Sequence, residues 1–325
     1  MILGIALGFG AATSNSIAYL LSRSFLSKHN KGYFHLLAFS HTILGLISIC
    51  LVPLFFTENM PKISEYATSL ASAALLYFGA QASLFMTLRK TEPSRVAPLL
   101  GSKIIILALI SIIFLDKHFV PAQWLAIFFS FSAAIILSGA GSRIPLSSFF
   151  FVMLTCLGYS LSDLNIANLI GNFEAAGFSL VRACMFSTVL CYIVCGFLSV
   201  IILILLPDKQ ISMFKDVLPF AVFWYAAMFF LFGCFGTIGI MYGNIIQSTR
   251  GIISVIIAAV ISTIIGFQHL EKKVTKMVLL RRITAAILMT TAIALFYINR
   301  KPEEQNKSAA ARAARLTSTP QICDK

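Results

Sequence analysis

Two ionisable residues lie well inside long apolar stretches of this sequence, Lys103 and Asp163. Lys103 lies 8 residues after Arg95 and 13 before Asp116, so it would lie close to the midplane if that stretch crossed a bilayer. A charge at that depth costs at least ~2.5–3.5 kcal/mol on insertion scales, which calls for a partner, a water-filled cavity or a bound anion. We therefore expect Lys103 to contact a substrate, or else to belong to a buried pair that only fixes packing.

Asp163 has three possible roles that the sequence leaves open. It could pair with Lys103, bind a cationic group of a substrate, or take up a proton as the coupling ion. Its side chain is expected to face the interior beside Asn165 or Asn168. A purely structural ion pair is the alternative.

Further polar and aromatic side chains fall inside apolar stretches and could line a cavity. Single residues of these types in helices are also common as packing groups with satisfied hydrogen bonds. We predict that the following bind substrate together with Lys103 and Asp163: Asn15, Tyr77, Gln81, Tyr159 and Trp224.

Catalytic and nucleotide-hydrolysing motifs are missing from the sequence. It contains no HExxH, GxSxG, Walker A or Rossmann glycine pattern. The expectation is a protein that is not an enzyme and uses no cofactor or metal. Any transport would then run on an ion gradient, on exchange with a counter-substrate, or downhill.

The composition is that of a membrane protein. Hydrophobic residues make up 58% of the 325 residues and charged residues only 11%, whereas soluble domains average roughly 25% charged. The mean hydropathy is +0.90. The net charge of +13 does not indicate nucleic-acid binding, because the basic residues lie mainly in connections and near the C-terminus. Such residues commonly face lipid headgroups.

Hydropathy predicts an all-α integral membrane protein with ten transmembrane helices. The first is expected to be retained rather than cleaved as a signal peptide. Residues 299–325 change abruptly in composition and are predicted to form a disordered basic tail. The ten predicted spans are 2–22, 34–56, 67–88, 94–115, 121–138, 147–170, 178–206, 217–241, 248–268 and 277–298.

The spans divide into two similar halves, residues 1–138 and 139–298. Arg95 precedes Asp116 by 21 residues, and Arg250 precedes Glu271 by the same interval. At ~1.5 Å per residue this is about 30 Å, the thickness of the hydrocarbon core, so we expect these four residues to cap the ends of two equivalent helices.

A second match, Ser14-Asn15 with Ser162-Asp163, supports the duplication. Since each half has an odd number of spans, the second would cross the membrane in the opposite direction. The halves would then form an inverted repeat.

The segment Thr91-Glu92-Pro93-Ser94-Arg95-Val96-Ala97-Pro98-Leu99, the apolar run to Asp116-Lys117, and then Gln123-Trp124 resemble the EamA-type repeat of the drug/metabolite transporter superfamily. The resemblance implies ten helices around a central cavity that carries small metabolites by alternating access. Some divergent members of similar size exchange S-adenosylmethionine for its demethylated product. A nucleoside-type or amino-acid-like zwitterion would suit one lysine and one aspartate.

The predicted function is therefore secondary transport of a small organic metabolite, with a coupling proton or counter-substrate as further partner. The expected location is a lipid bilayer, the inner membrane of a bacterium. The family implies that both termini are cytoplasmic, whereas the lysines and arginines of the loops favour the reverse orientation. A scaffold or receptor that keeps the fold without transporting is the alternative function. The sequence predicts no oligomeric state.

Overall fold

A computed structural model of the chain describes residues 1–29, 33–55, 60–91, 96, 99–115, 118–138, 145–207, 210–264 and 276–298. In these ranges the protein is all helical, and the predicted all-α integral membrane fold is confirmed. The predicted caps Arg95, Asp116 and Glu271, and the predicted basic tail, lie outside the described residues.

Six helices of the described part are long and apolar enough to cross a membrane. They are α1 (Ile2–His29), α2 (Tyr33–Leu51, extended to Leu54 by the 3-10 helix η1), α3 (Ile63–Lys90), α7 (Leu146–Ala175), α8 (Leu180–Leu205) and α9 (Ser212–Ile238). The remaining predicted spans coincide with shorter helices. These are the 3-10 helix η2 (Leu100–Ser102) with α5 (Lys103–Leu115), then α6 (Pro121–Ser138), α11 (Arg250–Ile264) and α12 (Lys276–Ile298).

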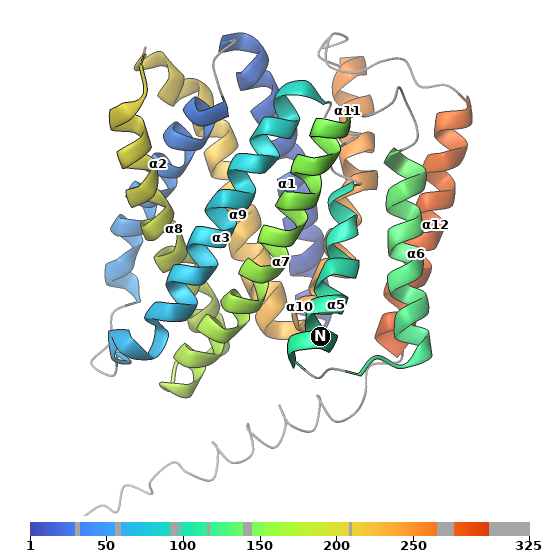
Figure 1. Ribbon diagram of the computed structural model, residues 1–325, viewed down its shortest axis with the longest axis horizontal. Coiled ribbons are helices and arrows are strands. Elements are labelled where there is room, and N and C mark those ends of the chain that lie inside the picture. The colour runs from blue at the N-terminus through green and yellow to red at the C-terminus, as the bar shows by residue number, and fades with distance from the viewer. Residues whose placement is uncertain are drawn as a thin grey trace, which may run out of the picture.

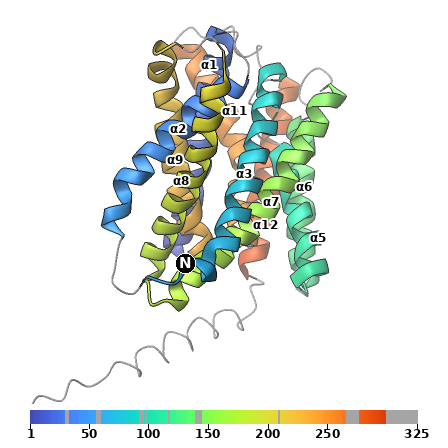
Figure 2. The ribbon, with the colours of Figure 1, turned by 60° about the vertical axis from the view of Figure 1, so that its left-hand side comes forward.

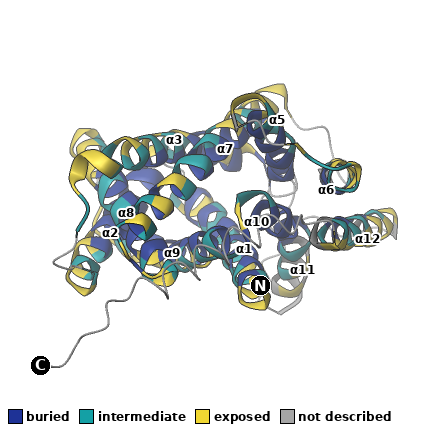
Figure 3. Cartoon of the chain, turned by 90° about the horizontal axis from the view of Figure 1, so that it is seen from below, coloured by how far each residue is buried: buried dark blue, intermediate teal, exposed yellow. Residues whose placement is uncertain are grey.

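The helices pack in pairs that join the two halves of the chain (Figure 1). α1 packs against α9, and α3 packs against α7. α2 pairs with α8, and α6 pairs with α12. The α6–α12 pair lies at one edge of the molecule, as the view from below shows (Figure 3). The core therefore lies between the halves rather than within either one.

The α2–α8 crossing is close because two glycines face each other there. A Cβ atom built on Gly45 would come within 2.6 Å of the Gly196 Cα, and one built on Gly196 would meet the Gly45 Cα at the same distance. Small residues permit this backbone approach between membrane helices. His41 and Tyr192, each one turn before its glycine, are both buried there, with ring centroids 6.1 Å apart. Figure 2 shows α2 and α8 from another side.

A glycine also breaks the helix near the end of the eighth predicted span. Gly239 has φ +84° and ψ 160°, a conformation that is essentially restricted to glycine. It ends α9 and begins the short helix α10 (Ile240–Gln247), which lies before α11. The sequence had placed residues 242–247 between two spans. Instead, most of α10 is buried, because it packs against α1, α5 and α12.

Candidate functional site

A cavity lies in the middle of the bundle, lined by side chains from α1, α3, α5, α7, α8, α9 and α11. It encloses about 550 Å³ of space between atoms, of which about 40 Å³ is open to the centre of a water molecule. The present conformation is therefore compact, with most of the space close to side chains. One side of the cavity is charged and the other is aromatic.

The charged side contains a buried ion pair between helices of the two halves. Lys103 Nζ lies 2.5 Å from Asp163 Oδ2, and both side chains are at most 7% exposed. Asn244 of α10 donates a hydrogen bond of 2.7 Å to the same carboxylate oxygen. An ion pair in a low-dielectric interior needs such additional hydrogen bonds, because desolvating the two charges is costly.

The break before α5 explains how Lys103 reaches this position. Helix η2 gives way to α5 at Lys103 itself, so the lysine begins a helix within the buried region. Side chains of α7 pack along the break. Ser160 Oγ lies 3.4 Å from the Lys103 carbonyl oxygen, and Cys156 Sγ lies 3.9 Å from the carbonyl oxygens of Leu99 and Leu100. α7 thus supplies both the acid and the groups that support the lysine's backbone.

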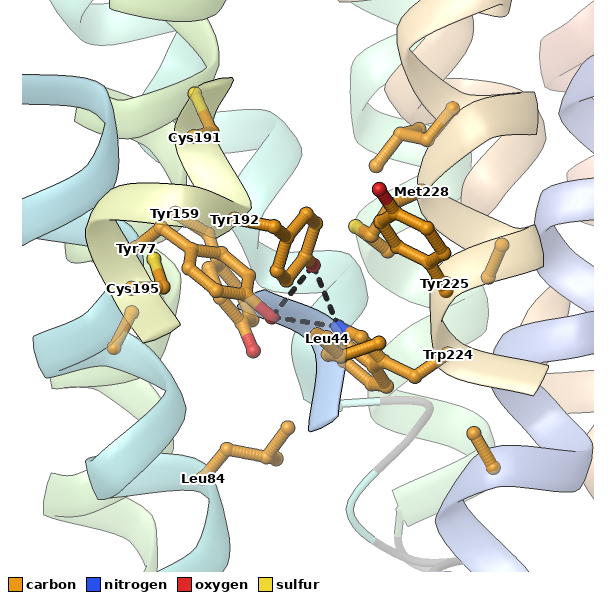
Figure 4. Close-up of a cluster of buried hydrophobic side chains, with 14 of the residues drawn as sticks. Leu44, Tyr77, Leu84, Tyr159, Cys191, Tyr192, Cys195, Trp224, Tyr225 and Met228 are labelled. Carbon is orange, nitrogen blue, oxygen red and sulfur yellow. Dashed lines mark hydrogen bonds between the residues drawn. The ribbon is translucent and has the colours of Figure 1, made fainter. Parts of the chain in front are cut away.

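The aromatic side is organised around the hydroxyl of Tyr77 (Figure 4). Trp224 Nε1 donates to it at 2.5 Å and Tyr192 OH at 2.8 Å, while Trp224 Nε1 also lies 2.8 Å from Tyr192 OH. His41 Nδ1 lies 3.0 Å from the Leu37 carbonyl and therefore carries the proton, so Nε2 accepts from Tyr77 OH at 3.2 Å. One hydroxyl thereby links α2, α3, α8 and α9.

Tyr159 connects the two sides of the cavity. Its ring lies 5.4 Å from Lys103 Nζ, within the range of a cation–π contact, and it stacks on Tyr77 with ring centroids 5.8 Å apart. Its hydroxyl donates to Gln81 Oε1. A ligand in the cavity would meet ring faces on one side and charges on the other.

Most of the predicted site residues are brought together. Lys103, Asp163, Asn15, Tyr77, Tyr159 and Trp224 all line the cavity. Gln81 is not among the lining residues and acts behind them, as the partner of Tyr159. The polar neighbour predicted for Asp163 was Asn165 or Asn168, but the residue that hydrogen-bonds to it is Asn244.

Arg250 differs from the expectation for a cap at the end of a membrane span. It begins α11 as the pattern predicted, but its side chain is buried, with 6% of the residue exposed, and it lines the cavity. The reason is the packing of α10 and α11 against α1, where Ser16 Oγ donates to the Arg250 carbonyl at 3.1 Å. The regular interval between Arg250 and Glu271 does not indicate how deep in the bundle the arginine lies.

The sequence analysis missed Tyr19, Tyr192 and Asn244. Tyr19 and Tyr192 line the cavity. Tyr19 lies one turn after Asn15, which was predicted, whereas no predicted site residue lies in α8 beside Tyr192. Asn244 was missed because it falls between two predicted spans. The signal available in the sequence was a polar residue, Asn244, about one and a half helical turns after a glycine, Gly239.

The fold and the cavity together define a class, the multi-pass α-helical membrane proteins with a central polar and aromatic cavity. The family follows from sequence comparison. The family model described as EamA-like transporter family matches residues 2–139. The first part of the chain is therefore similar to the EamA-like transporter family, which confirms the predicted resemblance.

Structural comparison agrees with this fold over nearly the whole chain. A solved structure, titled only as the crystal structure of a protein, matches with a TM-score of 0.63 at 14% sequence identity. The match covers 90% of this chain and 95% of that one. No curated protein matches the chain in sequence.

Proposed function

We propose that this protein is a secondary transporter that moves a small organic metabolite across a membrane by alternating access. The observation that carries the proposal is the buried Lys103–Asp163 ion pair, which joins the two halves inside a cavity. Ionisable residues within membrane segments are costly, and they typically mark substrate or ion pathways. The match of residues 2–139 to the model of a transporter family supports the same function.

The packing of the helices supports two inverted repeats, residues 1–138 and 139–298. In such a repeat, α7 is equivalent to α1, and α9 is equivalent to α3. The contact of α1 with α9 then has an equivalent, the contact of α7 with α3, which is present. The α2–α8 and α6–α12 pairs map onto themselves. A pseudo-two-fold axis through the α2–α8 crossing accounts for this pattern. Rocking of the halves about that crossing would expose the cavity to each side in turn.

The ion pair gives the cavity a way to couple binding to movement. A zwitterionic substrate can replace both partners, with its anionic group on Lys103 and its cationic group on Asp163. A proton on Asp163 would also release Lys103 and weaken the link between α5 and α7. Either event removes a contact between the halves, so binding would bias the equilibrium between closed and open states.

The aromatic wall supports a substrate with a flat ring. Tyr77, Tyr159 and Trp224 line the same cavity as the ion pair, and Figure 4 shows their rings close to one another. A nucleoside-type or amino-acid-like zwitterion such as S-adenosylmethionine has a ring for this wall and charges for the opposite one. We propose this substrate class, with exchange for a related compound as one mode, in the inner membrane of a bacterium.

The test is uptake of labelled S-adenosylmethionine, and of a labelled metabolite extract, into proteoliposomes that hold the purified chain. We expect wild-type vesicles to take up labelled solute, and unlabelled solute inside to accelerate uptake if transport is by exchange. Lys103→Ala and Asp163→Asn should each abolish the flux, while Asp216→Asn, an acid of α9 outside the cavity, should leave it unchanged. Normal flux in both cavity variants contradicts the site assignment, and no flux of any solute contradicts the function.

A further inference from the structure

Arg250 places a second cation in the cavity, at the break between α10 and α11. α10 ends at Gln247, and α11 begins at Arg250. The backbone continues across the break through short turns, with Gly251 N donating to the Ser248 carbonyl at 3.2 Å. Because Arg250 is the first residue of a 15-residue helix, the partial positive charge of the helix N-terminus adds to that of its guanidinium.

The hydrogen-bond inventory of the cavity is incomplete at this residue. Arg250 Nε is buried and has no hydrogen-bond partner among the described residues, and the same holds for Asn15 Oδ1. In contrast, both partners of the Lys103–Asp163 pair are satisfied by each other and by Asn244. A buried donor left without an acceptor costs about 1–3 kcal/mol, and more when the group is charged.

The charges of the described lining residues are also unequal. Lys103 and Arg250 are cations, and Asp163 is the acid that faces them. Asp163 lies within hydrogen-bond distance of Lys103 and pairs with it. The charge of Arg250 must therefore be balanced by a group other than this acid. A bound anion would balance the charge in a place where water is scarce.

Arg250 Nε and Asn15 Oδ1, two of the buried atoms without a partner among the described lining residues, belong to neighbouring parts of the structure. Ser16, the residue after Asn15, donates to the Arg250 carbonyl and holds the first turn of α11 against α1. Arg250 offers N–H donors in a fork that fits the two oxygens of a carboxylate. Asn15 Oδ1 offers an acceptor for an N–H donor such as an ammonium group. Together they complement an acid group with a nearby amine.

We propose that Arg250 and Asn15 form the anion subsite of this cavity. Arg250 binds the carboxylate of the transported solute, and Asn15 accepts from an adjacent amine, while the aromatic wall takes the rest of the molecule. The inference rests on the proposed transport function and narrows its substrate to carboxylates that carry an amine. The ligand docks first at this subsite, while the Lys103–Asp163 pair is still closed, and its charged groups replace the two partners of that pair in a later step.

The test measures binding rather than flux, by using Trp224 as a reporter inside the cavity. The full chain with Trp124→Phe, which leaves Trp224 as its single tryptophan, is placed in lipid nanodiscs and titrated with four probes. S-adenosylhomocysteine and phenylalanine carry the carboxylate and the amine. Phenylalaninamide lacks the acid, and phenyl phosphate offers a different anion without the amine.

We expect the two amino acids to change the Trp224 emission and to bind at least about tenfold more tightly than phenylalaninamide, the effect of one charge-assisted interaction. Arg250→Gln should remove that preference, and Arg250→Lys should restore part of it. Asn15→Ala should weaken the binding of both amino acids without weakening the binding of phenyl phosphate. Arg182→Gln, which changes an arginine of α8 that does not line the cavity, is the matched control and should keep the wild-type preference.

The proposal is overturned if Arg250→Gln keeps the wild-type preference for acids over the amide, or if neither amino acid binds the parent protein. A higher affinity for phenyl phosphate than for phenylalanine in the parent also overturns it. Thermal unfolding of each variant in the same nanodiscs separates lost binding from lost folding, and Arg250→Lys retains the charge if Arg250→Gln does not fold. Acid-selective binding without flux would contradict the proposed function alone, and flux without acid selectivity would contradict this subsite alone.

Discussion

The two halves of the molecule place different side chains at matching positions around one cavity. Asn15 in α1 corresponds to Asp163 in α7, and both line the cavity. Lys103 and Arg250 each begin a helix that follows a break, one in each half. The backbone arrangement is shared, but the second half has an acid where the first half has an amide. This asymmetry leaves one cation paired and the other available for a ligand.

The same contrast exists on the aromatic side. Tyr77 near the middle of α3 faces Trp224 near the middle of α9, and the two are joined by a hydrogen bond (Figure 4). At the α2–α8 crossing, Gly45 and Gly196 provide only close backbone contact. Under the proposed repeat, the positions at which the two halves differ supply the chemistry.

Asp163→Ala should be much more harmful than the matching change Asn15→Ala. Without its acid, Lys103 becomes an unpaired buried cation, and breaking a buried pair costs about 3–5 kcal/mol. Asn15→Ala removes an amide whose oxygen has no partner among the described residues, so it should cost far less. The free energy of unfolding in mixed micelles measures both.

The double variant Lys103→Met/Asp163→Leu is the control for that prediction. It removes both charges and should be more stable than Asp163→Ala, although inactive. Equal stability of Asp163→Ala and Asn15→Ala would mean that the two positions are equivalent and that the ion pair contributes little.

Enlarging either glycine at the α2–α8 crossing should separate the helices. In Gly45→Ala, the added methyl group would meet the backbone of Gly196 at 2.6 Å, and backbone atoms cannot move aside as a flexible side chain can. Overpacking of this kind costs typically about 1–3 kcal/mol. Gly79→Ala and Gly171→Ala are matched controls, because nothing lies within 4 Å of a Cβ there. A Gly45→Ala variant as stable as these controls would contradict the close crossing and its role as the axis.

Tyr77→Phe should have a smaller effect, about 1–2 kcal/mol, because it removes one hydroxyl shared by His41, Tyr192 and Trp224. Trp224 Nε1 keeps Tyr192 as a partner, so the loss is partial. Tyr225→Phe, which breaks a single bond to Ser48, is the comparison variant. Tyr77→Phe should also shift the Trp224 emission, whereas Tyr225→Phe should shift it less. The opposite order would argue against the central role of the Tyr77 hydroxyl.

The fold was largely predictable from the sequence because lipid imposes strong constraints. Apolar stretches of membrane length fix the helices, and every predicted span falls on a described helix. Lys103 and Asp163 could be predicted as site residues from the sequence. A charge inside an apolar stretch is costly unless a buried partner or a polar cavity stabilises it. Their mutual contact was one of three roles considered for Asp163.

Depth and helix breaks were not predictable in the same way. Arg250 resembled a surface cap because a regular interval to Glu271 carries no information on tilt or on packing against α1. The role of Asn244 was not predictable from the sequence. It depends on the positive φ of Gly239, which turns the chain back into the bundle. Several glycines lie in this stretch, and the sequence does not indicate which of them adopts a positive φ. Tyr192 became relevant only through the crossing of α2 and α8, a contact between residues far apart in the sequence.

Solute flux through Asp163→Asn proteoliposomes tests the central claim most directly. We propose that substrate binds between the halves, at the acid that only the second half provides. Wild type and Asp216→Asn should carry labelled S-adenosylmethionine or another solute of the labelled extract at the same rate. Asp163→Asn, shown to be folded by its thermal unfolding profile, should carry none above protein-free vesicles. Undiminished flux through folded Asp163→Asn would contradict the account.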